Sequence, residues 1–318
     1  MKESDIHIIF EVLTGSRLYG TNRPDSDYDY KGIAIPPIET FLGNQNFEQL
    51  EEKKPRDRTI YALSKFVQLA LDCNPNIIEL LFAPRKYWVK STSIWELILQ
   101  NRDKFLSKKC RYSFLGYAFS QLKRIRTHKH WIDNTPEEPN RKEMGLSLES
   151  KIRPDVLEAL RTIPTSIIGE HLSQEIQGEL KYLTAKKNWD SYKKWKRTRN
   201  PARYELESKY AIDTKHALHL VRLIKTGREL LTTGELTVDR REIDAGELLD
   251  ILHGKLTYEE IVAYAENMEK EFEELYDKSP LPHSPDRKGV EELLINIYYD
   301  FFGIDSKKAN LAIKNANL

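Results

Sequence analysis

The chain has 318 residues, of which 40% are hydrophobic and 31% charged, a composition typical of a globular protein with one large or two modest domains. Fifty Lys and Arg against forty-nine Asp and Glu give a formal charge of +1, which excludes a generally cationic coat protein but not a local basic patch. No apolar run approaches the roughly 20 residues of a membrane span. The two cysteines and the acidic N-terminal stretch lead us to expect a cytoplasmic protein without a membrane partner.

The first third of the chain predicts a mixture of strands and helices. Residues 6–13 are rich in β-branched side chains and run into a Gly-Ser turn, and residues 28–35 predict a second strand that closes at two prolines. Residues 38–56 are polar and acidic and predict a loop. Residues 59–61 open a third extended segment, and from Leu63 onward the apolar spacing becomes helical.

Beyond about residue 95 the pattern is helical. Helical spacing covers residues 91–130, 155–190, 202–231, 245–277 and 288–303, and Thr257 with Glu260 matches a capping box. We therefore expect an α+β fold, in which a small mixed-sheet domain over residues 1–105 is followed by a larger all-helical domain over residues 106–318.

Glycine, serine and acidic residues gather between the first two predicted strands. Gly15 and Ser16 follow a strand and can present N–H groups and a hydroxyl to phosphate oxygens. We expect both residues, together with Arg17, to contact the nucleotide. Eleven residues after Ser16 come Asp27 and then Asp29, which on a strand would point to the same face. Two carboxylates held together repel unless they share a proton or bind a cation, and beside phosphates that cation is Mg²⁺.

These residues in this order predict a two-metal site for in-line attack on a nucleotide phosphate, with Mn²⁺ as a substitute for Mg²⁺. The alternative is a pair of unrelated surface turns, because Asp-x-Asp and Gly-Ser are both common. Their order, behind one strand and before another, favours the site.

The same residues resemble a known signature. Gly15 through Gly20, followed by Ser26 through Tyr30, resembles the DNA polymerase β nucleotidyltransferase superfamily, and most closely its RNA-repair-pathway branch. Further segments that resemble this branch are Ser64-Lys65-Phe66, Asn74-Pro75, Glu79-Leu80-Leu81 and residues 229–236. The resemblance implies nucleotidyl transfer from an NTP with release of pyrophosphate, and its name implies an RNA terminus as the acceptor.

The superfamily has a third carboxylate on a neighbouring strand, and our candidate is Asp57. Strand alternation would place Asp57, Thr59 and Tyr61 on one face. The alternative is a solvated acid within a charged loop. By the resemblance, Asp27, Asp29 and Asp57 would hold Mg²⁺ and carry the catalysis.

A basic segment in the helical half is compatible with an RNA partner. Residues 186–203 contain eight Lys and Arg and one Asp, with Trp189, Tyr192 and Trp195 at a spacing of three. Such a segment can bind a single strand through phosphate contacts and base stacking. It can equally be a helix whose aromatic stripe packs inward while its lysines face water.

A second polar stripe predicts contacts with a triphosphate or a nucleic-acid backbone. Lys215, His219 and Arg222 recur at helical spacing, and we count all three as nucleotide-binding candidates. The run from residue 199 to residue 223 again resembles the RNA-repair-pathway branch. The alternative is a solvated stripe with a partly buried histidine.

Two other functions stay open at this point. The same chemistry can serve a different acceptor, either a protein side chain or a small molecule. Alternatively, the chain is a nucleotide- or nucleic-acid-binding module without turnover.

Overall fold

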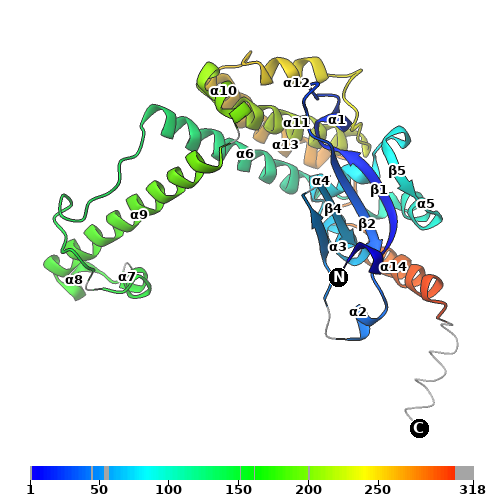
Figure 1. Ribbon diagram of the computed structural model, residues 1–318, viewed down its shortest axis with the longest axis horizontal. Helices are drawn as coiled ribbons and strands as arrows, with labels where there is room; N and C mark the ends of the chain where they lie inside the picture. Colours follow the sequence, from blue (N-terminus) through cyan, green and yellow to red (C-terminus); the bar gives the residue numbers. More distant parts are fainter. Residues whose placement is uncertain are drawn as a thin grey trace, which may run out of the picture. The chain divides into compact units, whose positions relative to one another are not determined.

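The computed structural model describes residues 2–43, 46–53, 57–150, 152–160, 162–199 and 201–304 (Figure 1). The chain divides into two compact units, one formed by residues 1–123 with 214–318 and the other by residues 124–213. The first boundary falls within α6 (Cys110–Asp133). Within the described ranges, no helix is long and apolar enough to cross a membrane.

The first unit is built on a five-stranded sheet of order β3-β4-β2-β1-β5. The pair β2–β4 is parallel and the other neighbours are antiparallel, so the sheet is mixed and the predicted α+β class is confirmed. The strands are β1 (His7–Thr14), β2 (Asp29–Ile35), β3 (Gln49–Glu52), β4 (Asp57–Ala62) and β5 (Trp88–Ser91).

Aromatic side chains fill the core between this sheet and two helices. The helix α3 (Leu63–Leu71) packs on β2 and β4, and α5 (Ser93–Gln100) packs on β1. Phe10 of β1 stacks on Trp95 with ring centroids 4.0 Å apart, and Phe66 of α3 meets the same indole at 5.6 Å. All three side chains are fully buried, so the apolar spacing of the first third is explained by this core.

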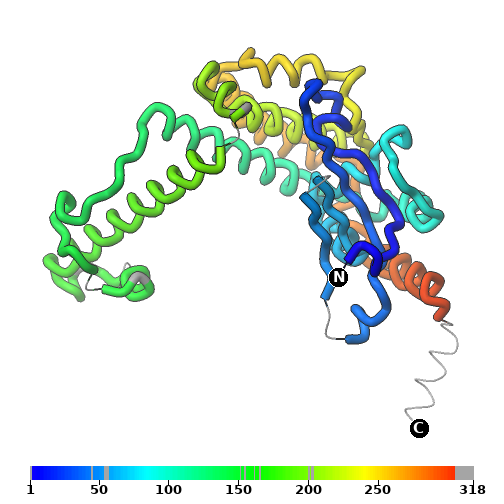
Figure 2. The backbone as a smooth tube through the Cα atoms, viewed as in Figure 1, coloured from blue at the N-terminus to red at the C-terminus, as the bar shows by residue number. Residues whose placement is uncertain are grey.

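The C-terminal helices belong to the same unit as the sheet. The helix α11 (Thr214–Thr233) packs against both α12 (Ala245–Leu252) and α13 (Tyr258–Lys278) (Figure 2). The capping box predicted at the start of α13 is confirmed, since the Glu260 amide donates to Thr257 Oγ1 at 3.2 Å and the Thr257 amide donates to Glu260 Oε2 at 2.8 Å. The other helices of this unit are α1 (Gly15–Tyr19), α2 (Glu39–Leu42), α4 (Pro75–Leu81), α14 (Arg287–Phe302) and three short 3₁₀ turns at Glu3–Asp5, Arg85–Tyr87 and Arg102–Phe105.

This division differs from the expected one at residue 105. The helix α14 packs on α3, and the Asp286 amide donates to the Lys104 carbonyl at 2.9 Å. Arg102 forms an ion pair with Glu235 at 2.6 Å, across 133 positions of the chain. Because these contacts join segments that are distant in sequence, local spacing could not show that the sheet and the last helices form one unit.

The second unit is helical. It contains the last part of α6 together with α7 (Pro154–Leu160), α8 (Thr165–Ile168), α9 (Glu170–Thr198) and α10 (Pro201–Tyr210). Figure 2 shows α7 and α8 beside the first turns of the long helix α9, which both of them contact.

Candidate functional site

Three strand ends bring Thr14, Asp29 and Asp57 into one row across the sheet. Thr14 ends β1 and pairs with Asp29, the first residue of β2, and Asp29 pairs in turn with Asp57, the first residue of β4. Because β2 and β4 are parallel and in register, the two carboxylates leave the same face from neighbouring strands. Thr14 Oγ1 donates to the Asp29 carbonyl at 3.2 Å, which links the end of β1 to the start of β2.

Asp27 lies in the loop before β2 and not on the strand. The expectation that Asp27 and Asp29 share a strand face is therefore wrong, because β2 begins at Asp29. The loop is held from α1 by Arg17, which donates to the carbonyls of Ser26 at 2.7 Å and of Asp27 at 3.3 Å. Asp27 is exposed, and its charge acts on Asp29.

The electrostatics around Asp29 are unfavourable for three ionised carboxylates, two in the row and Asp27 in the loop before it. Burial raises the pKa of the half-buried Asp29, and the negative charges of Asp57 and Asp27 raise it further. Lys215 and Lys31 act in the opposite direction. A gathering of carboxylates that raises one member's pKa is a fit for a divalent cation, since the cation would relieve the repulsion and accepts hard oxygen ligands.

Gly15 allows the start of α1 to approach the Asp29 carboxylate. Its φ is +67°, and a Cβ at this position would lie 2.3 Å from Asp29 Oδ2, so glycine is required for both the backbone and the space. Ser16 is half-buried in the same turn, and its carbonyl accepts the amides of Gly20 and Thr21. That Gly15 and Ser16 contact phosphates stays a prediction.

Two arginines expected to bind nucleotide are engaged within the protein. Arg17 holds the Ser26–Asp27 loop, and its guanidinium lies 3.7 Å from the centre of the Tyr28 ring. Arg222 of α11 is buried, forms an ion pair with Glu79, and lies 3.8 Å from the centre of the Tyr19 ring. Arg17 therefore orders the loop, and Arg222 belongs to the interior. That either arginine contacts a nucleotide stays a prediction.

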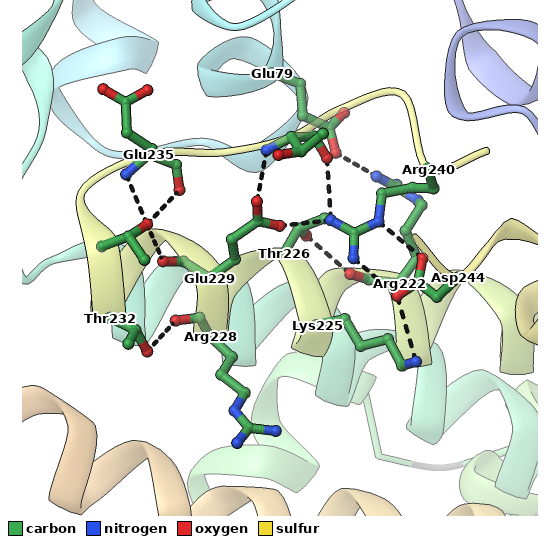
Figure 3. Close-up of polar contacts among 12 residues, drawn as sticks. Glu79, Arg222, Lys225, Thr226, Arg228, Glu229, Thr232, Glu235, Arg240 and Asp244 are labelled. Atoms are coloured by element: carbon green, nitrogen blue, oxygen red, sulfur yellow. Dashed lines mark hydrogen bonds and ion pairs between the residues drawn. The ribbon is translucent and has the colours of Figure 1, made fainter. Parts of the chain in front are cut away.

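Glu79 of α4 joins three segments of the first unit. Its Oε1 pairs with Arg222 (Figure 3), and its Oε2 accepts a 2.5 Å hydrogen bond from the Tyr19 hydroxyl of α1. Burial raises the pKa of Tyr19, so this hydroxyl stays a neutral donor. Both oxygens of the buried carboxylate are satisfied, which a buried charge requires.

Lys31 places a positive charge on the face that carries Asp29. It lies two residues further along β2, and its Nζ donates to the Asn76 carbonyl of α4 at 3.2 Å. Burial lowers the pKa of Lys31, while Glu79 and Asp29 oppose that shift. We did not single out Lys31 from the sequence, although strand alternation from Asp29 would have placed it on this face.

The predicted stripe on α11 runs from solvent into the interior. Lys215 is exposed in the first turn, and its charge lowers the pKa of Asp29. His219 is half-buried one turn further on, and Arg222 is fully inside. The structure therefore brings Lys215 into the electrostatic environment of the acids and takes Arg222 away from solvent.

The aromatic stripe of the basic segment packs within the second unit. Tyr192 is buried, and Trp131 of α6 lies with its ring centroid 5.9 Å from Tyr192 and 5.3 Å from Trp195. This favours the inward-packing interpretation over base stacking on these rings. Within residues 186–198 of α9, the exposed basic side chains are Lys187, Lys193, Lys194, Lys196 and Arg197. Of the predicted 186–203 segment, Asn200 and the side chains of Ala202 and Arg203 lie outside the described residues.

The N-terminal part of the chain matches a known protein family. Residues 1–143, which include all five strands and the three aspartates, match the RNA repair pathway DNA polymerase beta family. This part of the chain is therefore similar to polymerase β-like proteins, in agreement with the motifs quoted from the sequence.

A curated relative shares part of this region. The chain is 35% identical over 119 residues to a protein of Enterobacteria phage T4 described as an uncharacterized 38.9 kDa protein in the nrdC-mobD intergenic region. The match spans 34% of this chain and 35% of the phage protein, about a third of that relative's length. No solved structure matches the chain.

Proposed function

We propose that the chain is a Mg²⁺-dependent nucleotidyltransferase that moves NMP from an NTP to a hydroxyl at an RNA end. The observation that carries the proposal is the in-register pair Asp29 and Asp57, with Asp27 held beside it and the pKa of Asp29 raised. The match of residues 1–143 to a polymerase β-like family supports the same chemistry.

In the proposed reaction the acceptor hydroxyl oxygen attacks the α-phosphorus of the NTP. The new bond joins that oxygen to the α-phosphorus, and the bond to the bridging oxygen of the β-phosphate breaks, so pyrophosphate leaves. Asp57, exposed at the start of β4, takes the proton of the attacking hydroxyl. Lys215 offsets negative charge on the triphosphate from the first turn of α11.

The three aspartates fit the Mg²⁺ that this chemistry uses. They offer carboxylate oxygens, and their mutual repulsion is what a divalent ion neutralises. Bound there, two Mg²⁺ ions, or Mn²⁺ in their place, would neutralise phosphate charge and orient the reacting oxygens. Arg17 contributes indirectly, because its bonds to Ser26 and Asp27 fix the loop that presents Asp27.

The proposed RNA partner is supported by the exposed lysines of α9. A helix whose aromatic rings pack inward still offers its outer charges to phosphates. If these lysines bind RNA, replacing Lys193, Lys194 and Lys196 together by Gln should weaken RNA binding several-fold and flatten its dependence on salt concentration.

The test is transfer from α-labelled NTP to a short RNA with a free 3′ hydroxyl. The native chain is compared with Asp57→Asn, which keeps the shape of the side chain and removes its charge. Labelled RNA from the native chain alone supports the proposal. Label on protein or on a small-molecule acceptor moves the acceptor elsewhere, and NTP binding without any transfer leaves a binding module.

A further inference from the structure

We propose that Tyr28 is a stacking platform for a nucleobase at the edge of the acid site. The inference rests on the proposed function and adds to it the group that holds a base, as distinct from the groups that hold phosphate. Tyr28 stands between Asp27 and Asp29 in the chain, and 54% of the residue is exposed.

The ring is not a loosely held surface side chain. The Arg17 guanidinium lies 3.7 Å from the ring centre, within the range of a cation–π contact. Arg17 is itself bound to the carbonyls of Ser26 and Asp27, so one side chain orders both the loop and the ring. An aromatic ring that is ordered before its ligand arrives loses little conformational entropy on binding.

The helix that carries Arg17 is held in turn by a distant segment. The Arg241 guanidinium donates to the Arg17 carbonyl at 2.8 Å, and the Arg240 amide donates to the Tyr19 carbonyl at 3.0 Å. Gly20, at φ +77°, lies so close to Arg241 that a Cβ there would be 2.4 Å from the Arg241 Cγ. The support beneath Tyr28 therefore extends from the loop through α1 into residues 240–241.

A nucleobase is the ligand that suits this arrangement. A nucleotide carries a flat base at one end and charged phosphates at the other. Here an exposed aromatic ring, on which a base can stack, lies next to acids that fit metal-bound phosphates. Stacking tolerates any base, because every base has a π-face, so this platform predicts nucleobase binding without a strong base preference. The base can belong to the incoming NTP or to the terminal nucleotide of the RNA.

The experiment compares ligands with and without a base. Dissociation constants of ATP, inorganic triphosphate and a short RNA are measured with Ca²⁺ in place of Mg²⁺, which favours binding over turnover. The chains are the native protein, Tyr28→Ala, Tyr28→Phe and the control Tyr112→Ala. Tyr112 is a tyrosine on α6 with 60% exposure, which contacts Tyr276 rather than the acid loop.

We expect Tyr28→Ala to weaken the binding of one base-containing ligand by about 5- to 150-fold while triphosphate binding stays within about two-fold. A loss confined to ATP identifies the NTP base, and a loss confined to RNA identifies the acceptor base. Tyr28→Phe should retain native affinity, as should Tyr112→Ala.

Two results would overturn the inference while the native chain still binds triphosphate. One is unchanged affinity of Tyr28→Ala for both ATP and RNA, and the other is an equal loss for triphosphate, which would mean that the ring only places the loop. Failure of the native chain to bind triphosphate would instead remove the proposed function, and this inference with it.

Discussion

Two groups of charged residues in the first unit have opposite electrostatics. At the sheet edge, Asp29 faces Asp57 and Asp27, and its pKa is raised by burial and by these like charges. In the interior, Arg240 donates to both oxygens of Asp244 at 2.8 Å and also pairs with Glu229 (Figure 3). Burial would raise the pKa of Asp244, but Arg240 holds it below its usual value.

The two groups differ in what their carboxylates face: Asp244 faces a buried arginine, whereas Asp29 faces other carboxylates. A buried carboxylate depends on its arginine, because removing the arginine leaves an uncompensated charge in the interior. Carboxylates gathered beside one another instead repel, which is a pattern typical of functional sites. The comparison predicts that neutralising a member of each group will have opposite effects on stability.

The largest effect is expected for Asp29→Asn. In the proposed reaction Asp29 is a metal ligand, so its loss should lower activity by about 10²- to 10³-fold. The Tm of the metal-free protein should rise, since the like-charge repulsion is removed. Thermal unfolding in EDTA, alongside an activity assay, measures both, and a lower Tm would remove the distinction between the two groups.

The next effect concerns a second buried pair in the interior, Arg222 with Glu79. Arg222→Met leaves Glu79 buried without its cation and should lower the free energy of unfolding by about 3–5 kcal/mol. The control is Glu79→Leu combined with Arg222→Met, which leaves no lone charge and should lose less. Denaturant unfolding measures both, and equal losses would show that packing rather than charge pairing is at stake.

A smaller loss is expected where α1 meets the acids. Gly15→Ala combines a positive φ with a Cβ only 2.3 Å from Asp29 Oδ2, and should cost about 2–5 kcal/mol of unfolding free energy. Gly303→Ala has a similar φ of +65° and open space around the new Cβ, so it should lose only about 1–2 kcal/mol. Denaturant unfolding compares them, and similar losses would argue against close approach of Gly15 to Asp29.

The smallest effect is a pH dependence at Asp239. Burial would raise its pKa, but hydrogen bonds from Lys86 and Tyr87 lower it to about 2. Because the folded pKa lies below the unfolded value of about 3.9, the carboxylate contributes about 2 kcal/mol above pH 4, and this is lost as the pH falls toward 2. Asp239→Asn should therefore lower Tm at pH 7 and match the native chain near pH 2; a constant difference across this range would contradict the pairing.

Much of the fold follows from local pattern. The strands β1, β2 and β4 and the helix α3 lie where the spacing of apolar residues predicted them, because each contributes a buried face to one core. The short strands β3 and β5 were missed. Each has four residues at an edge of the sheet, where little apolar alternation is needed.

The site was predictable in part. Order and residue type singled out Asp27 and Asp29, and the resemblance to the superfamily added Asp57 as the third candidate. The structure places Asp57 in register with Asp29. The role of Arg222 was not predictable, because helical spacing cannot show that Glu79, 143 positions away, takes its guanidinium into the interior. The loop role of Arg17 likewise depends on backbone carbonyls, which carry no signal in the sequence.

The central claim is that the gathered aspartates are a metal site for nucleotidyl transfer. Its most direct test is pyrophosphate release from each NTP, with and without Mg²⁺ and short single-stranded RNA, by the native chain and by Asp27→Ala/Asp29→Ala. We predict Mg²⁺-dependent release that RNA stimulates and that the double variant lacks. Release that is equal in the two chains, or absent from the native chain under every condition, would contradict the account.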